Sequence, residues 1–165
     1  MEILAKIWQK LHLPKFVQLF VMRIFQDQFL IGVTGVILND KNEILLLKHN
    51  YRQTAWGLPG GYIKAKEHPQ EALEREIEEE SGFVVSADEE LNIRTDRHAA
   101  RMDIGFVGKL MGGEFKKSAE VVDARFFPFN DLPMLMSKKQ LFIIEQVLYQ
   151  KKFIAKSKVM QVTKY

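Results

Sequence analysis

The most informative part of this chain is residues 56–83, which read WGLPGGYIKAKEHPQEALEREIEEESGF. Leu73 and Ile77 recur at the four-residue spacing of a helix face that packs against a core. Gly82 suits the left-handed residue that commonly ends a helix. The spacing therefore predicts a glycine-rich loop followed by a helix over residues 68–81.

The predicted helix is strongly acidic. Glu76, Glu79 and Glu80 fall within one arc of about 100° around its axis. Like charges at these spacings repel by roughly 0.2–0.5 kcal/mol per pair, and no lysine or arginine is expected in the same arc. A divalent cation would neutralise the three carboxylates, and oxygen ligands favour Mg²⁺ or Mn²⁺ over zinc. Charge alone leaves a second interpretation open, in which the helix is an ordinary solvated acidic surface.

Three further glutamates of this helix are expected to face solvent: Glu71, Glu74 and Glu78. We expect Glu71 to pair with Arg75, because opposite charges four residues apart on a helix are neighbours.

The wider spacing is more specific than the charge. The pattern is Gly61-x5-Glu67-x7-Arg75-Glu76-Ile77-x-Glu79-Glu80-x-Gly82-Phe83. It resembles the Nudix box at every defining position, over residues 61–83. The resemblance to the Nudix hydrolase family covers roughly residues 29–150, because strands are expected before and after the box and a second helix closes the segment.

The resemblance implies an α+β fold, the Nudix α/β/α sandwich with a mixed central sheet. It divides the chain into a helical N-terminal extension (1–26), a Nudix hydrolase domain (27–153) and a basic C-terminal tail (154–165). It also implies an enzyme that directs water onto phosphorus in the diphosphate of a nucleoside diphosphate linked to another group. A nucleotide sugar or a nucleoside triphosphate is an example of such a substrate, and Mg²⁺ or Mn²⁺ is the expected cofactor.

Positions that match the family's motif carry its metal ligands and general base. The implied ligands are Glu76, Glu79 and Glu80, with the backbone carbonyl of Gly60. For the general base, the resemblance leaves a choice in which we favour Glu79 and place Glu76 second.

Other positions of the motif are implied to be structural. Arg75 would pair with Glu67 and orient Glu76. Gly61 and Gly82 would be backbone turns.

Many family members supply a further acidic group about forty residues after the box. Glu120 is our choice for this ligand, and Asp123 is the alternate. Both are equally well explained as surface residues beside a strand.

Basic and aromatic residues outside the box are candidates for binding substrate. They are Lys48, Tyr51, Arg52 and Arg97, with Arg101 as a further candidate. Each is more often a solvated surface residue. His49 and His98 have no partner at metal-ligand spacing, so we interpret them as non-ligands.

The substrate subtype is not marked in the sequence. The family's ADP-ribose type places a proline about fifteen residues after the box, and its dinucleoside polyphosphate type places a tyrosine slightly further on. Residues 96–100 read DRHAA instead, which weakens both assignments.

The sequence leaves two alternatives to small-nucleotide hydrolysis. RNA 5′ pyrophosphohydrolase or decapping activity would need a basic groove interleaved with aromatic residues, and the lysines of this chain lack that interleaving. A catalytically silent nucleotide-binding module would be expected to have lost box glutamates, and all are present.

Elements outside the box follow from local patterns. Strands are expected over 29–38, 43–48, 83–95, 101–110 and 121–127, a tight turn over 111–113 and a helix over 138–151. The tail after Phe153 is expected to fray.

Residues 1–25 are rich in large apolar side chains interrupted by lysine and arginine. Pro14 is expected to divide them into two short helices. We expect this extension to pack on its own domain or on a second subunit, with peripheral contact to a membrane surface as the alternative. No signal-peptide pattern is seen, and the expected location is cytoplasmic.

Composition sets outer bounds on function. The 165 residues contain no cysteine, which excludes disulfides, thiolate zinc sites and a cysteine nucleophile. The net charge of +3 suits anionic small molecules or nucleic acids without selecting either.

Overall fold

The computed structural model describes the backbone of residues 14–51, 56–96, 98–134 and 136–162, with side chains described as far as residue 150. Its helices and strands, in chain order, are α2 (Lys15–Phe25), β1 (Leu30–Leu38), β2 (Ile44–His49), β3 (Trp56–Gly57), β4 (Gly60–Tyr62), α3 (Pro69–Ser81), β5 (Phe83–Asp96), β6 (Arg101–Gly113), β7 (Val121–Phe127), the 3₁₀ turn η1 (Phe129–Asp131) and α4 (Lys138–Val162).

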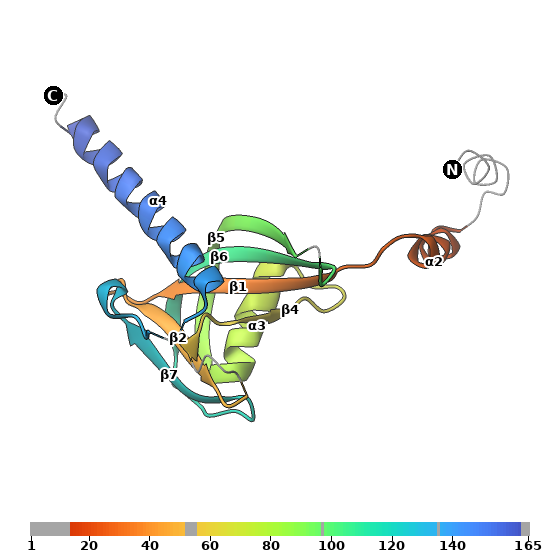
Figure 1. Ribbon diagram of the computed structural model, residues 1–165, viewed down its shortest axis with the longest axis horizontal. Coiled ribbons are helices and arrows are strands. Elements are labelled where there is room, and N and C mark those ends of the chain that lie inside the picture. Colours follow the sequence, from red (N-terminus) through yellow and green to blue (C-terminus); the bar gives the residue numbers. More distant parts are fainter. Residues whose placement is uncertain (1–13, 52–55, 97, 135, 163–165) are drawn as a thin grey trace.

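The strands form one mixed seven-stranded sheet. Five of them lie in the order β3-β2-β1-β6-β5, while β4 pairs with β1 and β7 pairs with β2. The β1–β6 pair is parallel and the other pairs are antiparallel. Figure 1 shows β1 and β6 running side by side, with α3 behind them.

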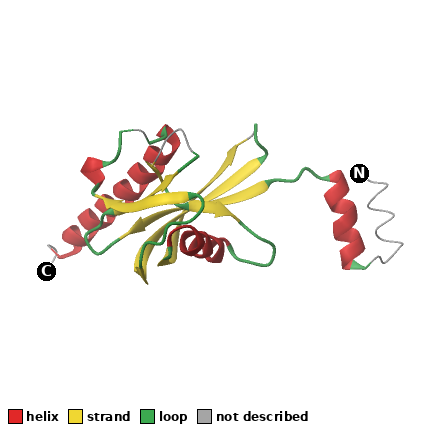
Figure 2. Cartoon of the chain, turned by 90° about the horizontal axis from the view of Figure 1, so that it is seen from below, coloured by secondary structure: helices red, strands yellow, loops and turns green. Residues whose placement is uncertain are grey.

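Both faces of the sheet are covered by a helix, and the sequence of β1 explains how. Val33 and Ile37 join the core cluster beneath α3, whereas Val36 and Leu38 join the cluster that contains Ile144 of α4. Successive side chains of a strand point to opposite faces, so a continuous apolar run supplies two cores. Figure 2 shows the sheet between these helices, which confirms the expected α/β/α sandwich.

Two boundaries differ from the expected ones. Residues 111–113 do not turn, because β6 continues through Gly113 and pairs with Phe83. A β-carbon at Gly113 would lie 2.3 Å from the carbonyl oxygen of Gly82, so only glycine allows this approach. The final helix continues to Val162 instead of fraying after Phe153, since no glycine or proline interrupts residues 139–162.

The N-terminal extension agrees with the expectation in part. Pro14 occupies the cap position of α2, as predicted for a helix that begins after the proline. The helix expected before Pro14 lies outside the described residues. None of the α2 side chains is buried, and Figure 1 shows α2 standing away from the sheet, so the expected packing on its own domain is not seen.

No helix in the described ranges combines the length and the apolar character that crossing a bilayer requires.

Candidate functional site

Helix α3 is fixed at both ends by local hydrogen bonds. The Glu71 carboxylate accepts from the backbone N–H of His68 at 2.8 Å, which satisfies a donor at the helix start. At the other end Gly82 has φ +75°, and its N–H donates to the carbonyl of Glu78 at 2.8 Å. Gly82 is therefore the predicted left-handed terminator, while Glu71 caps the helix instead of pairing with Arg75.

A second expectation for α3 is also wrong. Glu74 was expected to face solvent, but its carboxylate accepts from the backbone N–H of Ala87 in β5 at 2.9 Å. This bond ties the helix to the sheet, which the helical periodicity alone does not reveal.

Arg75 is the centre of an ion-pair cluster. Its guanidinium contacts both carboxylate oxygens of Glu67, from Nη2 at 2.8 Å and from Nε at 3.0 Å. The hydrogen bonds from this guanidinium, together with one from the backbone N–H of Lys64, lower the pKa of Glu67 to about 2. The same ion pairs raise the pKa of Arg75 above its ordinary value. The Arg75–Glu67 pair is thus present as expected and ties the loop to the helix.

The same guanidinium also reaches two of the expected metal ligands. Arg75 Nη1 lies 2.8 Å from Glu76 Oε1 and 3.1 Å from Glu79 Oε2, and Lys64 Nζ lies 3.4 Å from Glu79. The expectation that no basic residue shares their arc is wrong, because the long arginine side chain bends across the helix surface. Glu76 is largely buried, whereas the Glu79 side chain is 53% exposed.

Strand β4 brings the glycine loop against this cluster. Gly61 lies in β4, not in a turn, and a β-carbon there would lie 2.3 Å from Glu76 Cδ. Position 61 requires glycine because a side chain there would collide with the Glu76 carboxylate. The expected reason, a turn conformation of the backbone, does not apply. Gly60 pairs with Thr34 of β1, and a β-carbon on it would lie 2.1 Å from the carbonyl oxygen of Val33.

A second cluster joins three distant parts of the chain. Ligand atoms of His49 at the end of β2, Glu80 in the last turn of α3 and Glu120 just before β7 all lie within 4.8 Å of one another. Within the described ranges, this is the only trio of histidine, aspartate or glutamate side chains so close together. Glu80 and Glu120 therefore lie close together, as expected. Glu76 and Glu79 are instead ion-paired with Arg75.

The β2–β7 pairing explains why Glu120 is here and Asp123 is not. The register shifts between Lys48 and His49, so that Lys48 is opposite Asp123 but His49 is opposite Val121. Asn50 then closes the end of the pair, with its N–H donating to the Glu120 carbonyl at 3.1 Å. Asp123 instead pairs with Arg125 at 2.8 Å.

His49 was interpreted from sequence as a non-ligand, but the structure places it beside both carboxylates. It is only 3% exposed. No sequence signal identified it, because its neighbours in the cluster come from α3 and from the segment before β7, and a strand bulge sets their register. The one local hint is its position as the last residue of an otherwise largely apolar strand.

A cleft lies between the C-terminal end of β5, the N-terminal end of β6 and the start of α4. It has a volume of about 600 Å³ and is lined by Thr34, Arg94, Thr95, Asp96, His98, Arg101, Asp103, Ser137, Lys139, Gln140 and Ile143.

Arg101 connects this cleft to the Arg75 cluster. Arg101 Nη1 donates to the Tyr62 hydroxyl at 2.9 Å, and its guanidinium stacks 4.9 Å from the Tyr62 ring centre. The backbone carbonyl of Tyr62 accepts from Arg75 Nη2 at 3.1 Å. Tyr62 and Arg75 therefore link Arg101 in the cleft to the carboxylates of Glu76 and Glu79.

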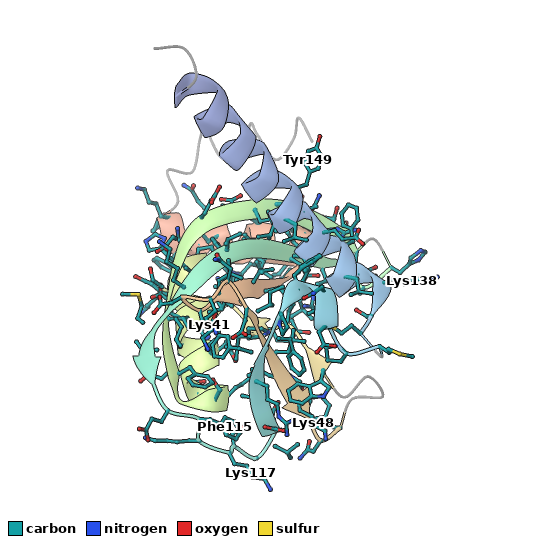
Figure 3. All side chains as sticks on the ribbon, turned by 90° about the vertical axis from the view of Figure 1, so that its left-hand side faces the viewer. Lys41, Lys48, Phe115, Lys117, Lys138 and Tyr149 are labelled. Carbon is teal, nitrogen blue, oxygen red and sulfur yellow. The ribbon has the colours of Figure 1, made fainter. Side chains whose placement is uncertain are left out.

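The other expected substrate contacts are less well supported. Lys48, which is labelled in Figure 3, lies near the end of the β2–β7 pair, and its Nζ is 6.0 Å from the Trp56 ring centre. The Tyr51 hydroxyl lies 3.2 Å from Glu120 Oε2, so Tyr51 belongs to the second cluster. Arg52 and Arg97 lie outside the described residues.

Comparison with known proteins finds relatives among pyrophosphatases and phosphatases of nucleotides. An ADP-ribose pyrophosphatase from Methanocaldococcus jannaschii is 34% identical over 111 residues, covering 64% of this chain and 65% of that protein. The human 8-oxo-dGDP phosphatase NUDT18 is 31% identical over 107 residues, covering 61% of this chain and 33% of that protein. The chain thus spans less than two thirds of the length of these relatives.

A solved structure of a nucleotide diphosphatase shares the fold of this chain. The crystal structure of a UDP-X diphosphatase superposes with a TM-score of 0.64 at 26% identity, covering 85% of this chain and 73% of that one. The NUDIX domain family itself matches residues 28–148. Together with the box on α3 and the sandwich around it, this match shows that the chain belongs to the Nudix hydrolase family.

Proposed function

We propose that this protein is a divalent-cation-dependent pyrophosphohydrolase that cleaves the diphosphate linkage of a nucleoside diphosphate derivative. The observation that carries the proposal is the meeting of Glu80 and Glu120 at the end of an intact Nudix box. Relatives named for ADP-ribose, 8-oxo-dGDP and UDP-X support it, because all three substrates are nucleoside diphosphates or their derivatives.

The donor set fits a divalent cation. Carboxylates from α3 and from the segment before β7, with an imidazole within 4.8 Å, suit Mg²⁺ or Mn²⁺. Glu80 and Glu120 would hold the cation, together with Glu76, Glu79 and the Gly60 carbonyl. A bound divalent cation neutralises phosphate charge and lowers the pKa of water.

The residues around this site position the reacting groups. Arg75 contacts both Glu76, whose side chain lies against β4, and Glu79 on the exposed side of α3. An ionised, solvent-accessible carboxylate is the form that takes a proton from attacking water. We therefore assign Glu79 as the general base, with Glu76 as the second candidate.

The cleft beside Arg101 is the proposed site for the rest of the substrate. Its four basic side chains, Arg94, His98, Arg101 and Lys139, outnumber its two carboxylates, Asp96 and Asp103, which pair with Lys139 and Arg101. This excess of basic groups suits an anionic ligand, and Tyr62, which contacts Arg101, is 47% exposed. An exposed aromatic ring beside a guanidinium is suited to stacking on a base or contacting a sugar. ADP-ribose belongs among the tested substrates, although residues 96–100 lack the proline of that subtype.

The alternatives are less well supported. For RNA, Phe115 is the aromatic residue nearest in sequence to Lys117, but it packs against Phe83 at 6.5 Å between ring centres and is therefore a poor stacking platform. A silent binding module is disfavoured because every glutamate of the box is present.

A hydrolysis panel tests the proposal. ADP-ribose, a nucleotide sugar, 8-oxo-dGDP, nucleoside triphosphates, dinucleoside polyphosphates and 5′-triphosphorylated RNA would each be incubated with Mg²⁺ or Mn²⁺, and products separated by chromatography. Cleavage within the diphosphate, abolished by EDTA and by Glu79→Gln, supports it. Glu78→Gln is the matched control, because Glu78 is an exposed neighbour outside both clusters. No cleavage of any substrate by the folded wild-type protein would reject the proposal.

Helix α2 supports a separate proposal about partners. Its large apolar side chains are exposed: Phe16, Leu19, Phe20, Met22, Ile24 and Phe25. Lys15, Gln18 and Arg23 fall within one arc of about 140° around the helix axis, which Leu19 and Met22 share. A basic amphipathic helix of this kind favours peripheral contact with an anionic lipid surface over a homodimer contact.

Vesicle co-sedimentation distinguishes these partners. The full chain should sediment with vesicles containing phosphatidylserine but not with neutral ones, and Phe20→Glu should abolish sedimentation. A vesicle-independent dimer in analytical ultracentrifugation, lost in Phe20→Glu, would favour a second copy instead. We propose that the protein is located in the cytoplasm. Cell fractionation should then recover it in the cytosolic fraction or, if α2 binds lipid, on the cytoplasmic face of the membrane.

A further inference from the structure

His49 is built into the second cluster more firmly than a surface histidine would be. It is 3% exposed and ends β2, a strand that pairs with both β3 and β7. The Asn50 side chain also donates to the Ala119 carbonyl at 2.8 Å, beside the Asn50–Glu120 backbone bond. The ring is therefore held next to Glu120 by the backbone and not by chance packing.

The two carboxylates of the cluster arrive from independent elements. Glu80 lies in the last turn of α3, which Glu74 ties to β5. Tyr51 donates to Glu120 Oε2 at 3.2 Å, and its ring stands edge-on to His49 at 5.4 Å between ring centres. A hydrogen bond to a ligating carboxylate orients it for a metal. Three elements thus direct one nitrogen ligand and two oxygen ligands to a common point.

Imidazole changes which cation such a site prefers. Mg²⁺ is a hard ion that favours oxygen ligands and retains much of its water. Nitrogen ligands strengthen binding of later divalent ions of the first transition series more than binding of Mg²⁺. A site with one imidazole and two carboxylates therefore differs in selectivity from the all-carboxylate site that the sequence indicates.

We infer that a ring nitrogen of His49 ligates the cation held by Glu80 and Glu120, and that this site selects Mn²⁺ over Mg²⁺. The inference rests on the proposed function only in that the same cation would serve hydrolysis. It assigns a specificity-determining role to a residue outside the Nudix box.

Pulsed electron paramagnetic resonance of the Mn²⁺-loaded full chain tests the ligand directly. Electron spin echo modulation should show coupling to a ¹⁴N nucleus, and labelling the protein with ¹⁵N-histidine should shift that modulation. His98→Gln should retain the signal, since His98 lies at the cleft and not in the cluster. Absence of nitrogen coupling in the wild-type protein with Mn²⁺ bound would overturn the inference without any variant.

Metal affinity gives the second measurement. His49→Gln should raise the Mn²⁺ dissociation constant about tenfold or more and change the Mg²⁺ dissociation constant much less. Equal loss for both ions, or persistence of the nitrogen signal in a folded His49→Gln protein, would also overturn the inference. If His49→Gln does not fold by circular dichroism, the labelled wild-type spectrum decides alone.

These outcomes separate the inference from the proposed function. Nitrogen coupling without hydrolysis of any tested substrate would leave the metal ligand assigned and reject the enzyme. Hydrolysis with Mn²⁺ but without nitrogen coupling would leave the enzyme and reject His49 as a ligand.

Discussion

The Arg75 guanidinium donates hydrogen bonds to both carboxylate oxygens of Glu67, at 2.8 and 3.0 Å, although the two residues are eight positions apart in the sequence. Glu67 lies in the loop before α3, and Arg75 lies in the middle of that helix. This two-point contact fixes the loop and the helix in one geometry, because a planar guanidinium and a planar carboxylate meet in one orientation. The remaining nitrogen of Arg75 is then available to Glu76 and Glu79.

The pair gives stability a defined pH dependence. The pKa of Glu67 falls from 4.5 to about 2 in the folded protein, so its stabilising effect is present above about pH 4.5 and is lost as pH falls towards 2. Urea unfolding measured at intervals over this range should show a decline in the free energy of unfolding that is shallower in Glu67→Gln. Identical slopes in the two proteins would show that Glu67 does not contribute. Arg75→Lys should resemble Glu67→Gln, because lysine cannot make the two-point contact.

A β-carbon at Gly61 should disturb catalysis more than folding. Gly61→Ala would place that carbon 2.3 Å from Glu76 Cδ, so the carboxylate must move. Displacing a catalytic group by about 1 Å costs on the order of a hundredfold in rate. Steady-state kinetics with the best substrate of the panel measure this loss. Gly112→Ala is the matched control, because nothing lies within 4 Å of its added β-carbon, and it should keep wild-type activity.

Local sequence patterns predicted helix α3 and its C-terminal end at Gly82, whereas contacts between segments distant in the sequence could not be predicted from such patterns. The Leu73–Ile77 spacing and Gly82 define the helix within a few residues of chain. By contrast, the position of His49 depends on a register shift in the β2–β7 pair. A one-residue change of register moves a side chain to the other face of a strand, so no pattern within β2 alone could place His49 beside Glu80.

The same distinction explains the errors around Arg75. Helical periodicity gives the direction of each Cβ, but not where a long side chain ends. Arg75 therefore reached Glu79 across an arc that was expected to contain no positive charge. Residues 111–113 were misassigned for a related reason: the two glycines suggest a turn, while pairing with Phe83 continues β6 as far as Gly113, where φ becomes positive at +82°.

Glu120 and Asp123 should respond differently to neutralisation. Glu120→Gln should weaken Mn²⁺ binding about tenfold or more and reduce hydrolysis, because Glu120 lies within 4.8 Å of Glu80 and His49. Asp123→Asn removes a partly exposed ion pair with Arg125, which is worth about 1 kcal/mol, and should preserve both properties. Isothermal titration calorimetry and initial rates measure the two effects. The reverse result would place the fourth acidic ligand at Asp123.

Arg101 should govern substrate affinity more than the chemical step. Its guanidinium lines the cleft and holds Tyr62, but it contacts none of the proposed metal ligands. Arg101→Gln should therefore raise KM roughly tenfold, as expected for loss of a charged hydrogen bond, with a smaller change in kcat, since binding lost equally from ground and transition states appears in KM. Lys109→Gln is the control, because Lys109 is exposed on β6 and faces Asp88 at 3.7 Å, away from the cleft. A fall in kcat at unchanged KM would instead place Arg101 at the reacting phosphates, and the cleft would then lie closer to the bond being cut than the proposed function requires.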